Sequence, residues 1–442
     1  MMKTDLASLM KADGFLCPSC GRRHFGSLSD CLIGDGVLEK LPALLEKYGV
    51  KKPFVLCDRD TYAAAGARVA GILSGAGAEY ALHIVERKKP APDERIVGEA
   101  ALWCPLDADA VIAVGSGVLN DTAKILAAHR HVPDLIVGTA PSMDGFGSGS
   151  SSMERGGLKV SMESKCPDAV IGEASVLASS PAHMIRSGIG DMLAKHVSIV
   201  EWKIAEVLVG DPFCGTVAGI VRDSLALCTA SAKDAVRGDP DAVKKVMEGL
   251  VVSGLAMNYV GISRPASGME HYISHILDMR ALAFGTPSDL HGIQCGIGTL
   301  MTVRAYEKLK DLEPDREKAL RHARAFDLSR WNDRLRAHLG EGAESMIRQE
   351  EKEGKYDLEK HELRLELILK NWERLLGFIG ELPSSDELEE FMKSIGHPTS
   401  YAEIGVSPAD ERAAFVMAKD IRDKYVLGRL LWDLGELNEE GE

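Results

Sequence analysis

Residues 110–124 have the sequence AVIAVGSGVLNDTAK, in which a short apolar run passes through Gly115-Ser116-Gly117 into a segment with helical spacing. An unbroken apolar run of this length is typical of a parallel strand that is buried on both faces. Glycines after such a strand allow the backbone to approach a ligand, and the start of the next helix offers N–H groups and the positive end of its dipole. The stretch therefore predicts an α/β domain that binds an anionic group at a strand-to-helix turn. The loop lacks a complete Gly-x-Gly-x-x-Gly pattern, so a tight turn without a ligand is the alternative.

The sequence on either side of this stretch alternates between strand and helix patterns. Strands are expected at residues 53–58, 80–86 and 134–137, and helices at residues 61–75 and 94–103. This alternation predicts a Rossmann-like parallel sheet that is covered by helices. After Pro181 helical periodicity replaces the strand patterns, so we expect an α/β N-terminal domain followed by an all-α C-terminal domain.

The chain is expected to have three parts. Residues 1–32 form an N-terminal extension, residues 33–180 the dinucleotide-binding domain, and residues 181–442 a helical metal- and substrate-binding domain with a charged C-terminal extension.

Three smaller segments also carry predictions. The Gly/Ser-rich residues 145–152 are expected to form a flexible loop, and residues 158–164 and 169–171 a hairpin. The dense charges between residues 304 and 376 are interpreted as solvated helix faces.

Composition limits the class of protein. The chain has 442 residues, 45% of them hydrophobic, and a formal net charge of −14. A large core is therefore available, and the acidic balance argues against a general binder of nucleic acid or anionic membranes. The longest apolar segment, residues 249–262, is too short and too interrupted to span a bilayer. Because no secretory signal is recognisable and the nine cysteines are scattered, we expect a protein of the reducing cytoplasm.

One group of possible metal ligands lies near the N-terminus. Cys17 and Cys20 form a Cys-x-x-Cys pair, and His24 and Cys31 follow. This spacing is compatible with a small zinc site. No second pair has zinc-finger spacing, so an ordinary loop with thiols is the alternative.

Polar residues follow the ends of the expected strands, where ligands bind in α/β sheets. Asp58 ends the first of these strands and is placed to accept hydrogen bonds from a ribose, although a helix N-cap is an equal alternative. Thr139 to Ser142 and Asp144 follow a later strand, and their polar groups are expected at the same edge of the sheet.

Four further residues have the chemistry of a divalent metal site. His271 and His275 are spaced i, i+4 and share one face of a helix, and His291 follows after a short interval. Asp191 lies much earlier, in a helical stretch. One carboxylate and two imidazoles leave an open position for substrate, which is typical of catalytic rather than structural sites. Sequence alone does not pair such distant residues.

Several separate motifs, in this order, carry a resemblance to a known group of enzymes. They are GSGVLNDTAK (115–124), TAPSMDGFGS (139–148), GIGDMLAK (188–195), SRPASGMEHYISH (263–275) and HGIQCGIGT (291–299). From about residue 34 to about residue 306 the chain resembles the metal-dependent, iron-type alcohol dehydrogenases, which include glycerol dehydrogenase and 3-dehydroquinate synthase. Within this group it looks most like the sn-glycerol-1-phosphate dehydrogenase family. A dehydroquinate synthase-like fold is implied.

The resemblance also implies residue roles. The implied metal ligands are Asp191, His271 and His291. The implied cofactor contacts are Asp58, Gly117, Val118, Leu119, Asn120, Asp121, Thr139, Ala140, Pro141, Ser142 and Ser148. Asp144, Asp191 and His275 are implied to face the substrate, and His275 and Asp121 are the catalytic candidates. Arg264 and Ser267 are weaker candidates for a substrate phosphate, with a structural loop as the alternative, and Lys195 is either near the metal or an exposed ion-pairing lysine.

The implied reaction is the reversible reduction of dihydroxyacetone phosphate to sn-glycerol 1-phosphate, a precursor of glycerophospholipids. It implies NAD(H) or NADP(H), one divalent Zn²⁺ or Ni²⁺ per subunit with Fe²⁺ as an option, a small-molecule phosphate substrate and a homodimer or higher homo-oligomer. Nucleic acid and membrane insertion are not expected. A glycerol dehydrogenase or 3-dehydroquinate synthase-like enzyme is the alternative within the group, and a non-catalytic NAD-binding sensor is the alternative outside it.

Overall fold

The computed structural model of the chain describes residues 6–10, 14–87, 90–156 and 158–439. The chain divides into two compact units, one formed by Met1–Met192 and Gly215–Ser263 and the other by Leu193–Cys214 and Arg264–Glu442. The division therefore differs from a single boundary at residue 180. The reason is that helix α11 (Pro240–Val260) packs against strand β3 (Asp30–Gly34) and α7 (Ala174–Ala178), so a helical hairpin from beyond the boundary belongs to the α/β unit.

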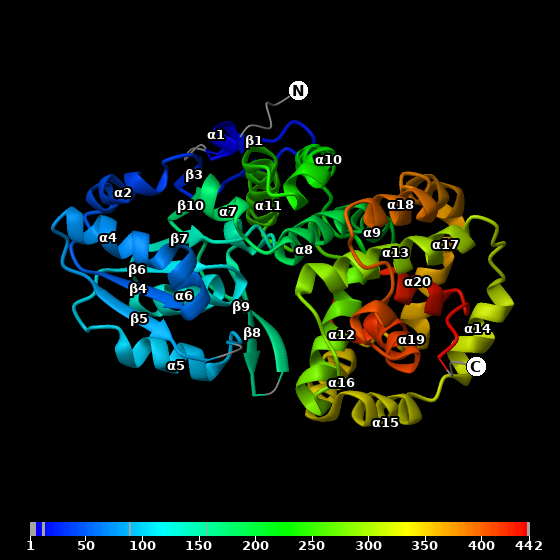
Figure 1. Ribbon diagram of the computed structural model, residues 1–442. Helices are drawn as coiled ribbons and strands as arrows, with labels where there is room; N and C mark the ends of the chain where they lie inside the picture. Colours follow the sequence, from blue (N-terminus) through cyan, green and yellow to red (C-terminus); the bar gives the residue numbers. More distant parts are fainter. Residues whose placement is uncertain (1–5, 11–13, 88–89, 157, 440–442) are drawn as a thin grey trace. The chain divides into compact units, whose positions relative to one another are not determined.

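The first unit contains a six-stranded parallel sheet, as the alternating pattern predicted (Figure 1). Its strand order is β3-β10-β7-β6-β4-β5. The strands are β3 (Asp30–Gly34), β4 (Pro53–Asp58), β5 (Ala81–Val85), β6 (Ala110–Gly115), β7 (Asp134–Gly138) and β10 (Ala169–Glu173). The sheet and the helix-rich remainder confirm the expected fold class of a Rossmann-like domain followed by helices.

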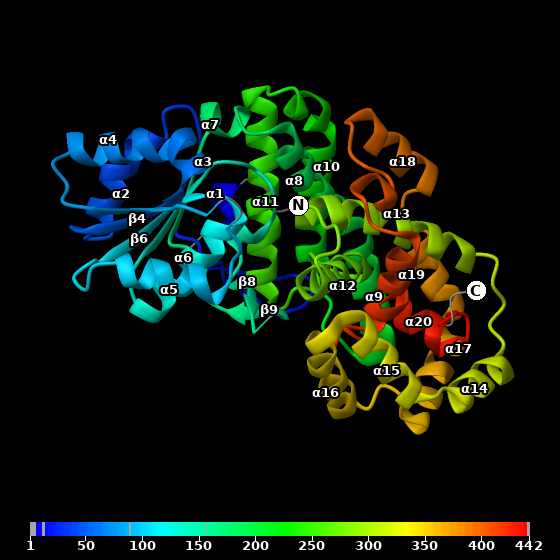
Figure 2. The ribbon, with the colours of Figure 1, turned by 60° about the horizontal axis from the view of Figure 1, so that its bottom comes forward.

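Helices cover both faces of this sheet (Figures 1 and 2). Helices α2 (Leu41–Lys47) and α4 (Ala67–Gly75) pack on one face, where the strands contribute Val55, Ile112 and Leu135, all fully buried. Helices α5 (Glu94–Trp103) and α6 (Gly117–Arg130) cover the other face. Because both faces are buried, the central strands are continuously apolar, which explains why the run at residues 110–114 was recognisable. The unit also contains α1 (Leu6–Leu9), β1 (Phe15–Leu16), β2 (Arg23–His24), α3 (Arg59–Thr61), α7 (Ala174–Ala178), α10 (Gly215–Val236), most of α8 (Ala182–Leu193), and the short η1 (Leu38–Lys40), η2 (Tyr62–Gly66) and η3 (Gly145–Gly147).

The expected hairpin of residues 158–164 with 169–171 is wrong. Strand β9 (Leu158–Glu163) instead pairs antiparallel with β8 (Ser150–Arg155), and β10 lies between β3 and β7 in the parallel sheet. The segment expected to be a flexible loop thus contributes the first half of strand β8. The apolar residues of β10 are fully buried in the sheet, which gives them more stabilisation than a two-stranded ribbon would. Strand β3 likewise places part of the expected N-terminal extension in the sheet.

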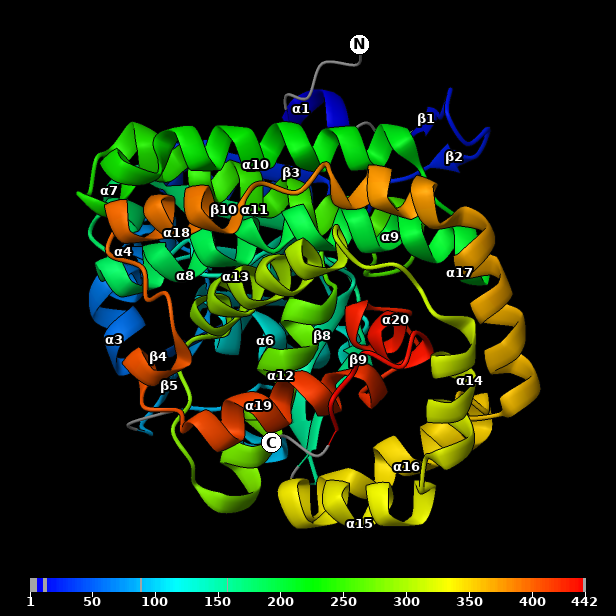
Figure 3. The ribbon, with the colours of Figure 1, turned by 90° about the vertical axis from the view of Figure 1, so that its right-hand side faces the viewer.

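The second unit is helical (Figure 3). Its core helices are α9 (Lys195–Val209), α12 (Met269–Phe284) and α13 (His291–Leu309). They are followed by α14 (Arg316–Ala325), α15 (Leu328–Leu339), η4 (Gly340–Gly342), α16 (Ala343–Glu353), α17 (Leu358–Ile379), α18 (Ser385–Ser394), η5 (Tyr401–Ile404), α19 (Pro408–Met417), η6 (Ala418–Asp420) and α20 (Leu427–Asp433). Among the described residues, no helix combines the length and apolarity that a membrane crossing needs.

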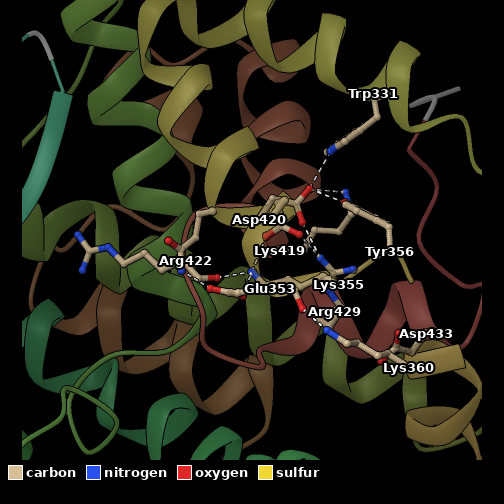
Figure 4. Close-up of polar contacts among 12 residues, drawn as sticks. Trp331, Glu353, Lys355, Tyr356, Lys360, Lys419, Asp420, Arg422, Arg429 and Asp433 are labelled. Carbon is tan, nitrogen blue, oxygen red and sulfur yellow. Dashed lines mark hydrogen bonds and ion pairs between the residues drawn. The ribbon is translucent and has the colours of Figure 1, made fainter. Parts of the chain in front are cut away.

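The charged C-terminal part holds a buried ionic cluster around Asp420 (Figure 4). The Asp420 carboxylate accepts hydrogen bonds from Trp331 Nε1 at 2.7 Å, from the Tyr356 hydroxyl at 2.5 Å and from Arg429 Nη2 at 2.6 Å. The ammonium of Lys419 lies 3.3 Å from the same carboxylate and 3.3 Å from the centre of the Trp331 ring. The interpretation of this region as solvated faces is therefore incomplete, because Trp331 and Tyr356 turn inward to partners from the end of the chain.

Candidate metal and cofactor site

Helices α12 and α13 bring the three histidines of the expected metal motifs together. His271 and His275 lie one turn apart on α12, and His291 is the first residue of α13, which packs against α12. The His291 ring lies 5.0 Å from the His271 ring and 5.7 Å from the His275 ring, measured between centroids. His271 and His275 are buried and His291 is half-buried. The packing of α12 against α13 therefore places the imidazoles of His271 and His291 where they can share one ion.

Glu270 orients the first of these imidazoles. Its Oε1 lies 2.9 Å from His271 Nδ1 and also accepts the Gly268 N–H at 2.6 Å. A carboxylate only accepts hydrogen bonds, so the proton lies on Nδ1 and the Nε2 lone pair is left for a metal. A carboxylate behind a ligating imidazole is the usual second partner in metal sites. The residue chemistry therefore fits a divalent ion.

Two neighbouring residues were not singled out by the sequence interpretation. Cys295 Sγ lies 3.6 Å from His291 Nε2, and donor atoms of His271, His291 and Cys295 all lie within 4.8 Å of one another. The same limit holds for His275, Asp278 and His291. Both additions follow helical spacing. Cys295 is at i+4 from His291, the spacing of His271 and His275, and Asp278 is at i+3 from His275. The helical spacing was thus the signal that could have found them.

Asp191 belongs to the first unit, near the end of α8, and is fully buried. Its Oδ2 accepts a hydrogen bond from the Asp144 backbone N–H at 2.8 Å. The Asp144 carboxylate in turn accepts from Ser253 Oγ at 2.8 Å. Two acidic residues from separate motifs are therefore joined in the first unit, and Asp191 fixes the backbone of the segment that follows β7.

The turns after β6 and β7 are tied to each other. The Thr139 N–H donates to the Gly115 carbonyl at 3.0 Å, and the hydroxyls of Ser116 and Ser142 are hydrogen-bonded to one another. Helix α6 begins at Gly117, so its first N–H groups lie at this edge of the sheet. The two segments predicted to contact the cofactor therefore form one surface at the carboxyl ends of neighbouring strands.

The side chains of Asp121 and Ser148 also stabilise this surface. Asp121 Oδ2 accepts the Ser152 N–H at 3.0 Å, and burial raises the pKa of the Asp121 carboxyl. The buried Lys124 ammonium donates to the Gly145 carbonyl and to Ser148 Oγ, the latter at 3.2 Å. Ser148 itself donates to the Ser150 carbonyl at 2.9 Å. These bonds hold the Gly/Ser-rich segment against α6.

Asp58 is the N-cap of α3. Its carboxylate accepts the Thr61 N–H at 2.8 Å, and its own N–H donates to Thr61 Oγ1 at 3.0 Å, forming a capping box. The structural alternative for Asp58 therefore applies, and a ribose contact would be an additional role of a half-buried residue.

Arg264, one of the two weaker phosphate candidates, has structural partners. Arg264 donates to Asp211 Oδ2 at 2.6 Å and to the Tyr425 carbonyl at 2.8 Å, so its guanidinium is held inside the helical unit. The interpretation of Lys195 as an exposed lysine is wrong, because it is fully buried and donates to the Ala266 carbonyl at 3.0 Å. Both side chains thus fix the segment that leads into α12.

Known proteins are similar to this chain in sequence or in fold. The family described as iron-containing alcohol dehydrogenase matches residues 32–181. A curated glycerol-1-phosphate dehydrogenase (NAD(P)+) from Bacillus licheniformis is 30% identical over 95% of this chain and 93% of its own length. The protein of that name from Halalkalibacterium halodurans is 27% identical over 92% of this chain and 93% of its own length.

Solved structures support the fold alone. A probable glycerol dehydrogenase from Sinorhizobium meliloti has a TM-score of 0.59 at 18% identity, covering 94% of this chain and 97% of its own. An archaeal alcohol dehydrogenase from a Red Sea brine pool has a TM-score of 0.63 at 15% identity, covering 95% and 99%.

The fold, the paired imidazoles and these matches define the chain as an iron-type alcohol dehydrogenase, a class of NAD(P)-dependent and metal-dependent oxidoreductases. Within this class the chain belongs to the glycerol-1-phosphate dehydrogenase family, as its full-length relatives show.

Proposed function

We propose that this chain catalyses the reversible, NAD(P)H-dependent reduction of dihydroxyacetone phosphate to sn-glycerol 1-phosphate, which feeds glycerophospholipid synthesis. The observation that carries the proposal is the match to a glycerol-1-phosphate dehydrogenase at 30% identity over 95% of the chain. We further propose that the enzyme acts in the cytoplasm as a homodimer or higher homo-oligomer, in line with the family resemblance.

We assign Asp191, His271 and His291 as the ligands of one divalent ion, which is zinc, nickel or iron because imidazole and carboxylate suit all three. The ion, when bound, supplies Lewis-acid polarisation of the substrate carbonyl, and the nicotinamide cofactor supplies the hydride. Glu270 supports the assignment, since its hydrogen bond to His271 Nδ1 leaves the lone pair of Nε2 available to bind the metal.

The remaining assigned residues bind the cofactor, donate a proton to the substrate or orient the proton donor. The N–H groups at the start of α6 and the turn from Thr139 to Ser142 are proposed to bind the dinucleotide phosphates, as helix N-termini favour anions. His275 is the proposed proton donor to the reduced oxygen, because imidazole titrates near neutral pH. Asp278, grouped with His275 within 4.8 Å, is the carboxylate that would orient it.

The test is a substrate comparison with the purified, metal-reconstituted protein. NADH and NADPH oxidation are followed with dihydroxyacetone phosphate, with unphosphorylated dihydroxyacetone and with no carbonyl substrate. We expect turnover with the phosphate ester only, and a product that a stereospecific sn-glycerol-3-phosphate dehydrogenase does not oxidise. Preference for dihydroxyacetone would establish a glycerol dehydrogenase instead, and tight NAD(H) binding without any turnover would establish the non-catalytic sensor.

A further inference from the structure

The N-terminal hairpin of β1 (Phe15–Leu16) and β2 (Arg23–His24) carries three sulfur or nitrogen donors. Cys17 and Cys20 lie in the loop between the strands, and His24 ends β2. The loop is closed by the Cys17 N–H, which donates to the Arg22 carbonyl at 2.8 Å, and by the N–H of Gly21, which donates to the Cys17 carbonyl at 3.0 Å. Gly21 has φ of 69°, a left-handed conformation that glycine adopts without strain. In this loop the sulfur atoms of Cys17 and Cys20 lie within 4.8 Å of each other.

A fourth donor comes from a distant part of the sequence. Cys214 is joined by its peptide bond to Gly215, the first residue of α10, and donor atoms of Cys17, Cys20, His24 and Cys214 all lie within 4.8 Å of one another. Cys31, the fourth residue expected from the sequence, instead lies in strand β3. The set is therefore three thiols and one imidazole, with three of the four residues buried and Cys20 half-buried.

Hydrogen bonds hold the hairpin and the start of α10 in this arrangement. The Thr216 N–H donates to Ser19 Oγ at 3.0 Å, and the hydroxyls of these two residues also lie 3.0 Å apart. Ser19 lies between Cys17 and Cys20 in the loop, and Thr216 is two residues after Cys214. The two halves of the donor set are thus linked through Ser19 and Thr216, both in the first unit.

The imidazole is oriented as a ligand. His24 Nδ1 lies 2.6 Å from the Tyr259 carbonyl, which only accepts, so Nδ1 carries the proton and Nε2 keeps its lone pair. That Nε2 lies 3.3 Å from Cys20 Sγ. In a tetrahedral zinc site with the usual bond lengths, the sulfur and nitrogen ligands are about 3.6 Å apart. The observed separation is therefore close to the one that a shared ion requires.

We propose that Cys17, Cys20, His24 and Cys214 bind one structural zinc ion, separate from the ion of the catalytic site. Four protein donors fill a tetrahedral zinc site and leave no position for substrate, which is the mark of a structural centre. Three thiolates select a soft ion such as zinc rather than magnesium or calcium. The site also explains how strands of two residues each persist, because so short a hairpin is not stable by itself.

The first experiment counts metal in the full-length protein purified with zinc under reducing conditions. We expect about two equivalents per chain in the unaltered protein and about one in Cys20→Ser and in Cys214→Ser. His271→Ala should also lose one equivalent, but a different one. Cys31→Ser is the matched control, since it removes a half-buried thiol outside the set, and it should keep both equivalents. Retention of both equivalents in Cys20→Ser and Cys214→Ser would overturn the proposal.

A second measurement does not depend on whether the cysteine variants fold. Cobalt(II) is added to the metal-free, unaltered protein and to His271→Ala. A site with three thiolates gives strong sulfur-to-cobalt charge-transfer absorption, and zinc should abolish it and protect about three cysteines from alkylation. The absorption should be as strong in His271→Ala as in the unaltered protein. The result of this measurement is therefore independent of the proposed catalytic function. Absence of this absorption, with unprotected thiols, would show that the cluster binds no metal.

Discussion

Glu270 Oε1 and His271 Nδ1 lie 2.9 Å apart in the first turn of α12, with both side chains buried. The pair joins adjacent residues of one helix, so no long-range contact is needed to orient the proposed ligand. We predict that Glu270→Gln weakens metal binding by about 10- to 100-fold, because a neutral amide polarises the imidazole less than a carboxylate. Metal titration followed by activity checks this, and excess metal should restore most of the rate. Unchanged metal affinity in Glu270→Gln would show that Glu270 does not support the metal ligand His271.

His271→Ala and His291→Ala are each predicted to lose the catalytic metal and at least about 100-fold of activity together, because two ligands are too few for a stable site. Metal analysis and NADH oxidation on the same preparation check this. His129→Ala is the matched control, since it removes an exposed imidazole on α6. Full activity with unchanged metal content would contradict the assignment. The variant Cys295→Ser tests whether Cys295 binds the metal or only lies beside the ligands. We expect this variant to keep the metal.

Asp58→Ser is predicted to shift the cofactor preference without unfolding α3. Serine preserves the N-cap that accepts from Thr61 N–H but removes the negative charge that repels a ribose 2′-phosphate. The ratio of kcat/KM for NADPH to that for NADH should rise by about tenfold, which corresponds to ~1.4 kcal/mol. The Tm should stay within a few degrees. An unchanged ratio at an unchanged Tm would show that Asp58 serves the helix cap alone.

Gly188→Ala is predicted to damage the turn after β7. A Cβ at Gly188 would lie 1.9 Å from the Pro141 carbonyl oxygen, so the backbone of the proposed cofactor segment has to move. We expect a loss of about 3 kcal/mol in the free energy of unfolding and a raised KM for NAD(P)H. Gly219→Ala on α10 is the control, because its Cβ would meet nothing within 4 Å and alanine favours helix. Equal behaviour of the two variants would refute this reasoning.

Asp134 predicts a pH dependence of stability. Burial raises the pKa of its carboxyl to about 7, although the charges of Lys124 and Lys165 act to lower it, and among the described residues neither carboxyl oxygen has a hydrogen-bond partner. The native state therefore holds a proton that the unfolded state releases near pH 4, so this contribution is complete at low pH and is lost as pH rises through about 7. Asp134→Asn should reduce the fall in unfolding free energy between pH 5 and 8 by up to about 3 kcal/mol. Urea denaturation across this range checks it, and an unaltered pH profile would contradict it.

The sequence predicted those parts of the molecule that depend on local pattern. Strand β6 and helix α5 were recognisable because burial on both faces and helical spacing leave a continuous signature. The pairing of β9 was not, because a strand pattern does not say which other strand lies beside it, and β8 and β9 form a separate two-stranded sheet. Histidine spacing on α12 gave the imidazoles, whereas Cys214 could not be linked to Cys17, because nothing near residue 214 marks it as a ligand.

Strand β3 has one neighbour in the sheet, β10, which is encoded far downstream. During synthesis β3 therefore stays unpaired until β10 has left the ribosome. Closing the long chain segment between β3 and β10 is a slow step. A chain begun at residue 33 would lack most of β3 and leave β10 as a bare, apolar edge, open to strands of other molecules. Strand β3, the first strand of the sheet along the chain, is thus the last to pair, and it protects the edge of β10 from aggregation.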